Sequence, residues 1–293
     1  MRTEVSKGKY VLAVSGGVDS MVLLDLLAKQ PDVELVVAHF NHGMRPDAHK
    51  DEELVKEQAK QLRLSFEVGY GRLGSRASEA TARNARYEFL EKIQRKHRAD
   101  AIITAHHQDD LLETAFLNLL RGTNYRGLVA ILSNKEVIRP LLNYPKQVIL
   151  DYAHKNGLEW REDISNQDDT YLRNHIRHNV LPRLSEIQKQ ELICNIDKVA
   201  KIEKNMSREI AKLSQHINKD FTIDRSKFNA LPVDLANELL AYWLRGSGIE
   251  FDKPTINRLN VALRTSKPGA NHPVRGKLSL AFNRRSAQFI NSL

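Results

Sequence analysis

Cysteine is almost missing from this chain of 293 residues, which has only Cys194. One thiol cannot form an internal disulfide or a Cys-x-x-Cys pair, and it cannot by itself hold an iron–sulfur cluster. The apolar neighbours Leu192, Ile193 and Ile196 predict that Cys194 packs in a core and is not a reactive group.

Long apolar runs are missing as well. No stretch approaches the roughly 18 residues that cross a bilayer, and the charged start lacks the apolar core of a signal peptide. We therefore expect a cytoplasmic protein with no membrane partner. A hydrophobic content of 41% over 293 residues predicts one large domain and a smaller one.

Acidic residues are scarce in one part of the chain only. Residues 1–170 hold 24 Lys and Arg against 25 Asp and Glu, whereas residues 171–293 hold 21 against 11. The formal net charge of +9 therefore comes from the C-terminal part. Clustered cations bind a polyanion by releasing its counterions, so this part predicts a nucleic-acid partner; a solvated basic face is the simpler alternative.

Apolar runs and amphipathic stretches alternate along the first 120 residues. The pattern predicts strands at 9–14, 35–40, 64–70 and 101–105, and helices at 21–28, 50–62, 78–96 and 110–120. This alternation is typical of an α/β fold with a doubly wound, mostly parallel sheet. Ligands of such sheets bind beyond the carboxyl ends of the strands, so we expect the site at 15–20, 39–42 and 106–110.

The rest of the chain predicts a connector and a second domain. The charged amphipathic stretch 184–217 suits a long helix. Beyond it, helices at 234–244 and 253–263 and strands near 274–282 and 286–290 predict a small α+β domain. We therefore divide the chain into a first domain over 1–182, a helical connector over 183–217 and a basic, nucleic-acid-binding domain over 218–293.

The first strand-to-helix turn carries six residues that we call the phosphate loop: Ser15, Gly16, Gly17, Val18, Asp19 and Ser20. Glycines let backbone N–H groups approach a ligand, and a helix N-terminus favours anions. The loop is therefore suited to holding phosphate. Neither G-x-x-x-x-G-K-[ST] nor G-x-G-x-x-G fits. The loop instead resembles that of the PP-loop ATP pyrophosphatases, which split ATP into AMP and pyrophosphate. This resemblance implies that the two serine hydroxyls bind the phosphates of ATP and that Asp19 helps to place Mg²⁺.

A histidine-containing segment follows the second predicted strand. Backbone amides at such a position commonly bind an adenine edge, which makes Ala38, His39 and Phe40 candidates for ATP binding. His39 and His42 are possible metal ligands, but no cysteine or third spaced ligand accompanies them. Hydrogen bonding is the better interpretation of both.

Two carboxylates open the helix predicted after the fourth strand. Asp110 and Glu113 are spaced i, i+3 and share one face, while Leu111 and Leu112 turn inward. The pair either binds Mg²⁺ or holds an ammonium-bearing substrate whose amine it deprotonates for attack. For Asp109 alone, the favourable interaction of a carboxylate with a helix N-terminus is a sufficient explanation.

Arg83 and Arg86 share a face of the helix predicted at 78–96. Arginines beside an ATP site stabilise charge that develops at phosphorus, which makes both catalytic candidates. The alternative is that both side chains are simply exposed to solvent, as most arginines on helices are.

These motifs occur in one order together with two more: NLLRGT at 118–123 and RNHIRHNVLP at 173–182. Over roughly residues 10–182 the chain resembles the tRNA(Ile)-lysidine synthetase family. That resemblance implies that ATP adenylates the 2-oxo group of the wobble cytidine in a CAU-anticodon tRNA(Ile), and that the ε-amine of free L-lysine then displaces AMP.

The resemblance also implies roles for individual residues. Asp110 and Glu113 are expected to bind the lysine ammonium, Arg83 or Arg86 the nucleotide, and Asp109 to share the metal with Asp19. RNA contacts are expected from Arg173, Arg177, Arg258, Arg264, Lys267, Arg275 and Lys277, with Arg284 and Arg285 as further candidates for phosphate.

The resemblance has two limits. Longer members carry a further C-terminal domain that the sequence lacks, so we expect a short form, and relatives suggest a possible homodimer. Thiolating enzymes of the same superfamily are the rival interpretation, but they generally depend on cysteines that Cys194 alone does not supply. A small-metabolite ligase would not need the basic C-terminal part, and a non-catalytic RNA binder would not need the phosphate loop or the carboxylates.

Overall fold

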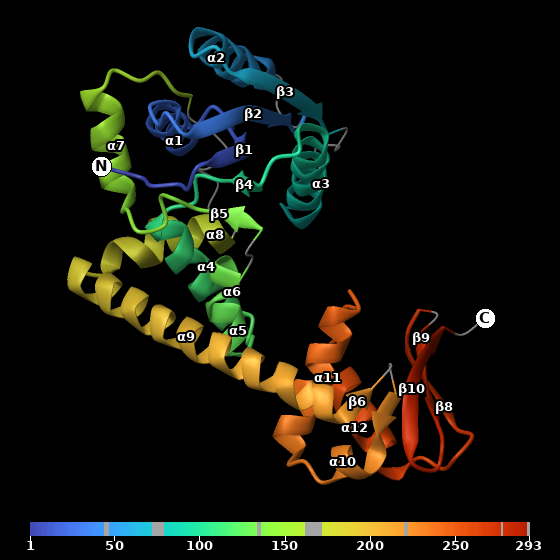
Figure 1. The fold of residues 1–293 in the computed structure, drawn as a ribbon. Coiled ribbons are helices and arrows are strands. Elements are labelled where there is room, and N and C mark those ends of the chain that lie inside the picture. Colours follow the sequence, from blue (N-terminus) through green and yellow to red (C-terminus); the bar gives the residue numbers. More distant parts are fainter. Residues whose placement is uncertain are drawn as a thin grey trace. The chain divides into compact units, whose positions relative to one another are not determined.

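The computed structural model describes residues 1–43, 47–71, 79–133, 136–161, 172–219, 222–276 and 278–291. The chain forms two compact units, Met1–Ala200 and Lys201–Leu293 (Figure 1). The long helix α9 (Glu186–Ile217) contributes residues to both units. The division into three parts at 182 and 217 therefore stays a prediction, since the compact units meet within the expected connector.

The first unit is built on a parallel sheet with the strand order β3-β2-β1-β4-β5. Its strands are β1 (Gly8–Ala13), β2 (Val33–Asn41), β3 (Ser65–Tyr70), β4 (Ala101–Ile103) and β5 (Val137–Ile138). Chain order runs outward from β1 to β3 and then continues at β4 on the other side. The switch point therefore lies between β1 and β4, where a ligand site is expected.

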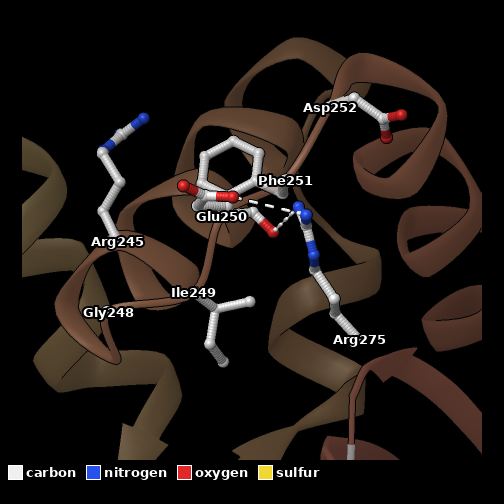
Figure 2. Close-up of a pocket in the computed structure, with 7 residues that line it drawn as sticks. All are labelled: Arg245, Gly248, Ile249, Glu250, Phe251, Asp252 and Arg275. Carbon is white, nitrogen blue, oxygen red and sulfur yellow. Dashed lines mark hydrogen bonds and ion pairs between the residues drawn. The ribbon is translucent and has the colours of Figure 1, made fainter. Parts of the chain in front are cut away.

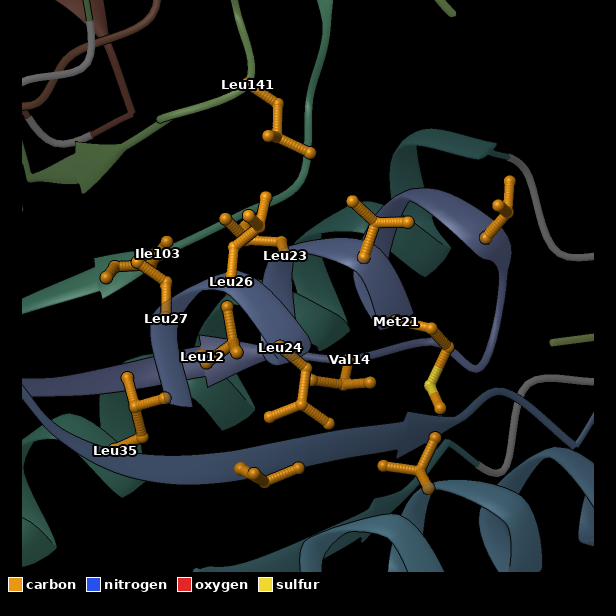
Figure 3. Close-up of a cluster of buried hydrophobic side chains, with 14 of the residues drawn as sticks. Leu12, Val14, Met21, Leu23, Leu24, Leu26, Leu27, Leu35, Ile103 and Leu141 are labelled. Carbon is orange, nitrogen blue, oxygen red and sulfur yellow. The ribbon is translucent and has the colours of Figure 1, made fainter. Parts of the chain in front are cut away.

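Alternate residues of the strands point to opposite faces of this sheet, as the period of a strand requires. Leu12 of β1 packs with α1 (Val18–Ala28), α2 (Ala48–Gln61) and α7 (Lys146–Lys155), in the core shown in Figure 3. Its neighbour Val11 packs instead with Leu90 and Ile93 of α3 (Glu79–His97). Helices on both faces confirm the doubly wound α/β fold.

A second group of helices in this unit surrounds α4 (Gln108–Leu120). Leu111 and Leu112 are buried as predicted, and they pack with Ile176, Leu181 and Ile196. The surrounding elements are α5 (Tyr125–Leu128), α6 (Ala130–Ser133), α8 (Leu172–His175), the π-helical turn η2 (Ile176–Val180), the 3₁₀ turn η3 (Leu181–Arg183) and the first half of α9.

The described residues of the second unit form an antiparallel sheet and three helices besides the end of α9. The strand order is β6-β7-β10-β9-β8. The strands are β6 (Asn218–Lys219), β7 (Thr222–Asp224), β8 (Asn271–Arg275), β9 (Leu278–Phe282) and β10 (Ser286–Asn291), and the helices are α10 (Arg225–Asn229), α11 (Val233–Gly246) and α12 (Lys253–Thr265). Buried side chains of α11, α12 and the sheet form its core.

Three details differ from the sequence predictions. The strand expected near 274–282 is two strands, because the chain turns at Gly276 with a φ of +57°. Helix α4 begins at Gln108 and not at Asp110. Cys194 is exposed, since it lies off the apolar stripe of α9 that buries Ile196. In the part of the chain that the structure describes, no helix has the length and apolar character to cross a membrane.

Candidate active site

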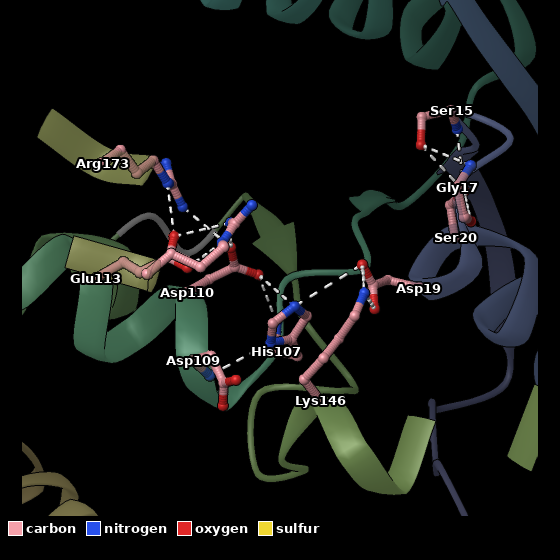
Figure 4. Close-up of polar contacts among 11 residues, drawn as sticks. Ser15, Gly17, Asp19, Ser20, His107, Asp109, Asp110, Glu113, Lys146 and Arg173 are labelled. Carbon is pink, nitrogen blue, oxygen red and sulfur yellow. Dashed lines mark hydrogen bonds and ion pairs between the residues drawn. The ribbon is translucent and has the colours of Figure 1, made fainter. Parts of the chain in front are cut away.

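The phosphate loop closes on itself through its two serines (Figure 4). The Ser20 hydroxyl donates to the Gly17 carbonyl at 2.8 Å and accepts the Ser15 N–H at 3.1 Å. The Ser15 hydroxyl lies 3.2 Å from that of Ser20 and accepts the Gly17 N–H at 3.3 Å. Ser20 is buried and Ser15 is exposed. Ser20 therefore shapes the loop, and Ser15 is the serine placed to meet a ligand.

The two glycines have different tasks in the loop. Gly16 has a φ of +91°, and a Cβ there would lie 3.4 Å from Cβ of Asp51. Gly17 precedes α1 without a side-chain cap, which leaves N–H groups of the first turn for an anion. Arg161 braces this turn, because its N–H donates to the Gly16 carbonyl at 3.0 Å and its Nε to Oδ1 of Asp51 at 2.7 Å.

Asp19, the predicted metal ligand, holds a lysine. Lys146, the first residue of α7, donates to both carboxylate oxygens of Asp19, at 2.6 and 2.7 Å. Nε2 of His107 lies 3.8 Å from Oδ2 of Asp19. Figure 4 shows the Asp109 carboxylate on the opposite side of His107 from Asp19, so the structure does not bring the two predicted metal ligands together. Among the described residues, no group of three or more His, Cys, Asp or Glu side chains is arranged for a metal.

The predicted carboxylate pair lies at the start of α4, directly after β4. Asp110 has an exposed fraction of 9% and Glu113 of 0%. His107 caps the helix: its N–H donates to Oδ2 of Asp110 at 2.9 Å, and its Nδ1 accepts the Asp109 N–H at 3.3 Å. This cap fixes Asp110 with one oxygen toward His107 and leaves its other oxygen for a cation.

Two arginines occupy both carboxylates. Arg173 donates through Nε to Glu113 at 2.8 Å and through Nη2 to Asp110 at 3.0 Å. Arg177 donates to both oxygens of Glu113, at 2.6 and 3.0 Å. The residues predicted for a lysine ammonium and two predicted for RNA thus bind each other, and two negative charges face two positive ones.

The backbone explains this pairing. Arg173 and Arg177 are four residues apart, which places both on one side of a helical turn. Ile176 between them is fully buried against Leu111 and Leu112 of α4. Burial of this isoleucine therefore fixes the arginines beside the carboxylates.

The environment keeps Asp110 ionised. Burial by itself would raise the pKa of this carboxyl, but His107, His106 and Arg173 and the backbone N–H of His107 lower the pKa to about 2. A carboxylate with such a low pKa is suited to holding a cation and is a weak proton acceptor.

Arg83 and Arg86 lie close enough to act on the same site. Both guanidinium groups contact the ring of Tyr87, at 5.0 and 5.7 Å from its centroid. Burial, together with the positive charges of Arg139, Arg86 and Arg83 and against the opposing charge of Asp110, lowers the pKa of His106 to about 3. The arginine pair and Asp110 therefore act electrostatically on the same neutral histidine.

Comparison with known proteins identifies the family behind this geometry. Residues 1–184 match the family profile described as PP-loop domain, which covers more than half of the chain. The chain belongs to the PP-loop family. This confirms the superfamily that the sequence of the phosphate loop resembled.

Curated proteins and a solved structure resemble the chain over different lengths. It is 38% identical to a tRNA(Ile)-lysidine synthase from Enterococcus faecalis over 192 residues, which is 62% of this chain and 42% of the relative. It is 33% identical to one from Streptococcus thermophilus over 274 residues, 89% of this chain and 61% of the relative. The chain therefore spans about half the length of these relatives.

The solved structure is that of the U34-tRNA thiolase NcsA from Methanococcus maripaludis with its [4Fe-4S] cluster. It has a TM-score of 0.56 and 16% identity, and the match covers 67% of this chain and 74% of that chain. This likeness confirms the fold of the PP-loop unit.

The predicted adenine-binding residues lie in β2 of the PP-loop unit. Ala38 accepts the Val14 N–H through its carbonyl at 2.9 Å. Beyond Ala38, β2 continues to pair with β3 while its pairing with β1 ends. One edge of residues 39–41 is thereby left open beside the phosphate loop. The His39 side chain is buried, with Nδ1 2.9 Å from the Val14 carbonyl, and burial lowers its pKa.

The predicted RNA-binding arginines of the second unit are largely engaged within the fold. Arg264 donates to Asn260 and to the carbonyls of Asn229 and Leu231. Arg275 pairs with Glu250 at 3.3 Å, as Figure 2 shows, and Arg258 donates to the Val274 carbonyl at 3.3 Å. Lys277 lies outside the described residues.

A second group of basic residues in this unit is exposed on two neighbouring loops. Buried Arg225 donates to the carbonyls of Leu263, Ser266 and Asn283, which ties the α12–β8 loop to the β9–β10 turn. The exposed residues next to these carbonyls are Lys267, Arg284 and Arg285, which we call the basic tip.

Sequence analysis missed three residues of the site. His107, Lys146 and Arg161 each join segments far apart in the chain. His107 caps α4, but histidine is not among the residues that mark a helix start in a sequence, and nothing near Lys146 or Arg161 indicates a partner on the phosphate loop or α2.

Proposed function

We propose that this chain ligates free L-lysine to the 2-position of the wobble cytidine in CAU-anticodon tRNA(Ile), with ATP as the co-substrate. The observation that carries the proposal is the placement of two buried carboxylates, Asp110 and Glu113, at the strand switch point beside the phosphate loop. Such a site binds a cationic amine next to a nucleotide. The names of the two curated relatives support lysine and tRNA(Ile) as the substrates.

The proposed reaction has two steps. The 2-oxo oxygen of the cytidine attacks the α-phosphorus of ATP, and pyrophosphate leaves. The ε-nitrogen of lysine then attacks C2, the bond from C2 to the AMP oxygen breaks, and the amine loses its protons. Adenylation supplies the leaving group, and the site supplies proximity of the amine to the activated carbon.

The phosphate loop is proposed to hold ATP. The exposed Ser15 hydroxyl and the N–H groups at the start of α1 bind phosphate. Adenine binds along β2 at Ala38, His39 and Phe40, where the pairing with β1 ends and the open edge begins. The half-buried Asp19 carboxylate would hold Mg²⁺ in place of Lys146, and the metal would neutralise phosphate charge. In Figure 4 the Asp109 carboxylate lies on the other side of His107, so Asp19 is the ligand that we propose. Arg83 and Arg86 stabilise charge on the nucleotide.

Asp110 and Glu113 are proposed to hold the lysine ammonium. The amine takes the place of guanidinium nitrogens of Arg173 and Arg177, so that one cation replaces another and the carboxylates never stand unpaired. Because the pKa of Asp110 is about 2, we assign Asp110 to holding the ammonium and not to removing its proton. A displaced Arg177 is free for the adenylated RNA.

Incorporation of radiolabelled lysine tests this function directly. With ATP and Mg²⁺, we expect label in a CAU-anticodon tRNA(Ile) transcript and none in the CAU-anticodon methionine tRNA. AMP and pyrophosphate should form in equal amounts with the incorporated lysine. AMP release without label would exclude lysine as the nucleophile, and uptake of sulfur from a sulfur donor would favour the thiolase alternative.

The basic tip is proposed to contact RNA phosphates. Replacing Arg284 and Arg285 together by glutamine is expected to weaken tRNA binding and to lower the slope of log K against log salt by about 1.5, because each phosphate contact contributes about 0.7 to 0.9. Filter binding from low to moderate salt measures the slope.

The matched control replaces Lys227 and Lys253, two exposed lysines of the same unit, by glutamine. This control removes the same charge and should leave the slope nearly unchanged. Equal slopes for the two double variants would show that the tip acts only through net charge.

A further inference from the structure

One imidazole stands between the phosphate loop and the carboxylate pair. His107 is buried, with an exposed fraction of 5%, and its ring lies between Asp19 and Asp110 in Figure 4. Nε2 is 3.8 Å from Oδ2 of Asp19 and 3.5 Å from Oδ2 of Asp110. Asp19 belongs to the loop proposed for ATP, and Asp110 to the pair proposed for lysine.

The helix cap determines which ring nitrogen carries the proton. Nδ1 of His107 accepts the Asp109 N–H at 3.3 Å, so this nitrogen presents its lone pair. In a neutral imidazole the other nitrogen is then the donor. His107 therefore directs a single Nε2–H toward two carboxylates.

Nε2 of His107 is too far from either carboxylate for an ordinary hydrogen bond. Both distances exceed the 2.7–3.2 Å of an ordinary N–H···O bond, so a small shift of either carboxylate settles which one receives the Nε2–H. Asp19 is held by the long, flexible side chain of Lys146, whereas Asp110 is held by the backbone N–H of His107 and by Arg173 and is more deeply buried. Asp19 therefore has more freedom to shift than Asp110.

We propose that His107 is a positioning residue that shares its Nε2–H between Asp19 and Asp110 and so transmits occupancy of the phosphate loop to the amine site. When a nucleotide with its Mg²⁺ binds beside Asp19, the Nε2–H of His107 turns to Asp110 and alters how tightly that carboxylate binds an amine. This inference rests on the proposed function for the identity of the two ligands, but the shared donor itself is a property of the chain.

Two substitutions separate this role from simple helix capping. In His107→Asn the amide oxygen takes the place of Nδ1 and keeps an acceptor at the cap, but the donor at the Nε2 position is lost. In His107→Gln the amide nitrogen reaches the Nε2 position, but the cap is weakened. If His107 acts only as a helix cap, the asparagine variant should keep the coupling between nucleotide and lysine binding of the natural protein, and the glutamine variant should lose it.

Coupling is measured as the ratio of lysine dissociation constants with and without a non-hydrolysable ATP analogue and Mg²⁺. We expect a ratio that differs from one by about fivefold in the natural protein and in His107→Gln, and a ratio near one in His107→Asn. The melting temperature should fall in the glutamine variant and not in the asparagine variant. Coupling that survives in His107→Asn overturns the proposal.

Nitrogen NMR of histidine-labelled protein tests the donor without any assumption about the reaction. The His107 signals are assigned by their loss in His107→Gln. We expect the Nε2–H tautomer and a shift of the Nε2 resonance when the ATP analogue is added. An Nδ1–H tautomer, or a resonance that the analogue leaves unchanged, refutes the shared donor. If lysine does not bind the natural protein, the proposed function is wrong, but the NMR measurement still tests whether His107 shares its donor between Asp19 and Asp110.

Discussion

Replacing Glu113 by alanine is expected to lower the free energy of unfolding by about 3 to 5 kcal/mol and to abolish lysine incorporation. The side chain is fully buried and receives Nε of Arg173 and both Nε and Nη2 of Arg177. Without it, two guanidinium groups share the single carboxylate of Asp110. Urea unfolding gives the stability, and label in tRNA gives the activity.

Glu209 offers a control on an exposed ion pair. It lies 2.7 Å from Lys212, with both side chains more than half exposed (67% and 64%). Its replacement by alanine should cost no more than about 1 kcal/mol and should leave lysine incorporation unchanged. Similar losses of stability in the two variants would mean that the arginine–carboxylate cluster contributes nothing beyond a surface pair.

Replacing Gly16 by alanine is expected to lower ATP-dependent AMP release at least tenfold. A φ of +91° disfavours any side chain, and the added methyl group would come into contact with Cβ of Asp51 at 3.4 Å. Relief of the backbone strain would shift the loop and misplace the N–H groups that we propose to bind the phosphates. Initial rates at saturating ATP measure the effect.

Gly157 separates the backbone penalty from the effect on the loop. Its φ is +61°, and a Cβ there would meet nothing within 4 Å. Gly157→Ala should therefore cost about 1 to 2 kcal/mol of stability, as backbone strain does, with an unchanged rate of AMP release. If both alanine variants lose activity alike, general destabilisation explains the loss.

The sequence predicted the sheet well, because each layer leaves a local periodic signal. Val11 and Leu12 point into two different cores, as the period of a strand predicts. The strand-to-helix turns then place the phosphate loop and the start of α4 at the same edge of the sheet. Element ends were harder to place. Gly276 splits one expected strand into β8 and β9. A glycine at this position can stand either in a turn or inside a strand, and the neighbouring sequence does not distinguish the two.

Charge partners were not predictable from local pattern. The sequence assigned Asp110 and Glu113 to one ligand and Arg173 and Arg177 to another, and only tertiary packing around Ile176 shows that they meet. Arg264 was likewise predicted to bind RNA from the surface, although its guanidinium donates hydrogen bonds to backbone carbonyls within the fold. A sequence lists charges, but their pairing depends on distances across the fold.

The direct pairing of β1 with β4 has a consequence for how this protein tolerates insertions and deletions. Tyr10, Val11 and Leu12 are in register with Ala101, Ile102 and Ile103, and the two functional segments follow these strands immediately. Everything between them in the chain, from β2 to α3, lies outside that pair. Related chains can lengthen or shorten the connections of this intervening part while the distance between the phosphate loop and the carboxylate helix stays the same.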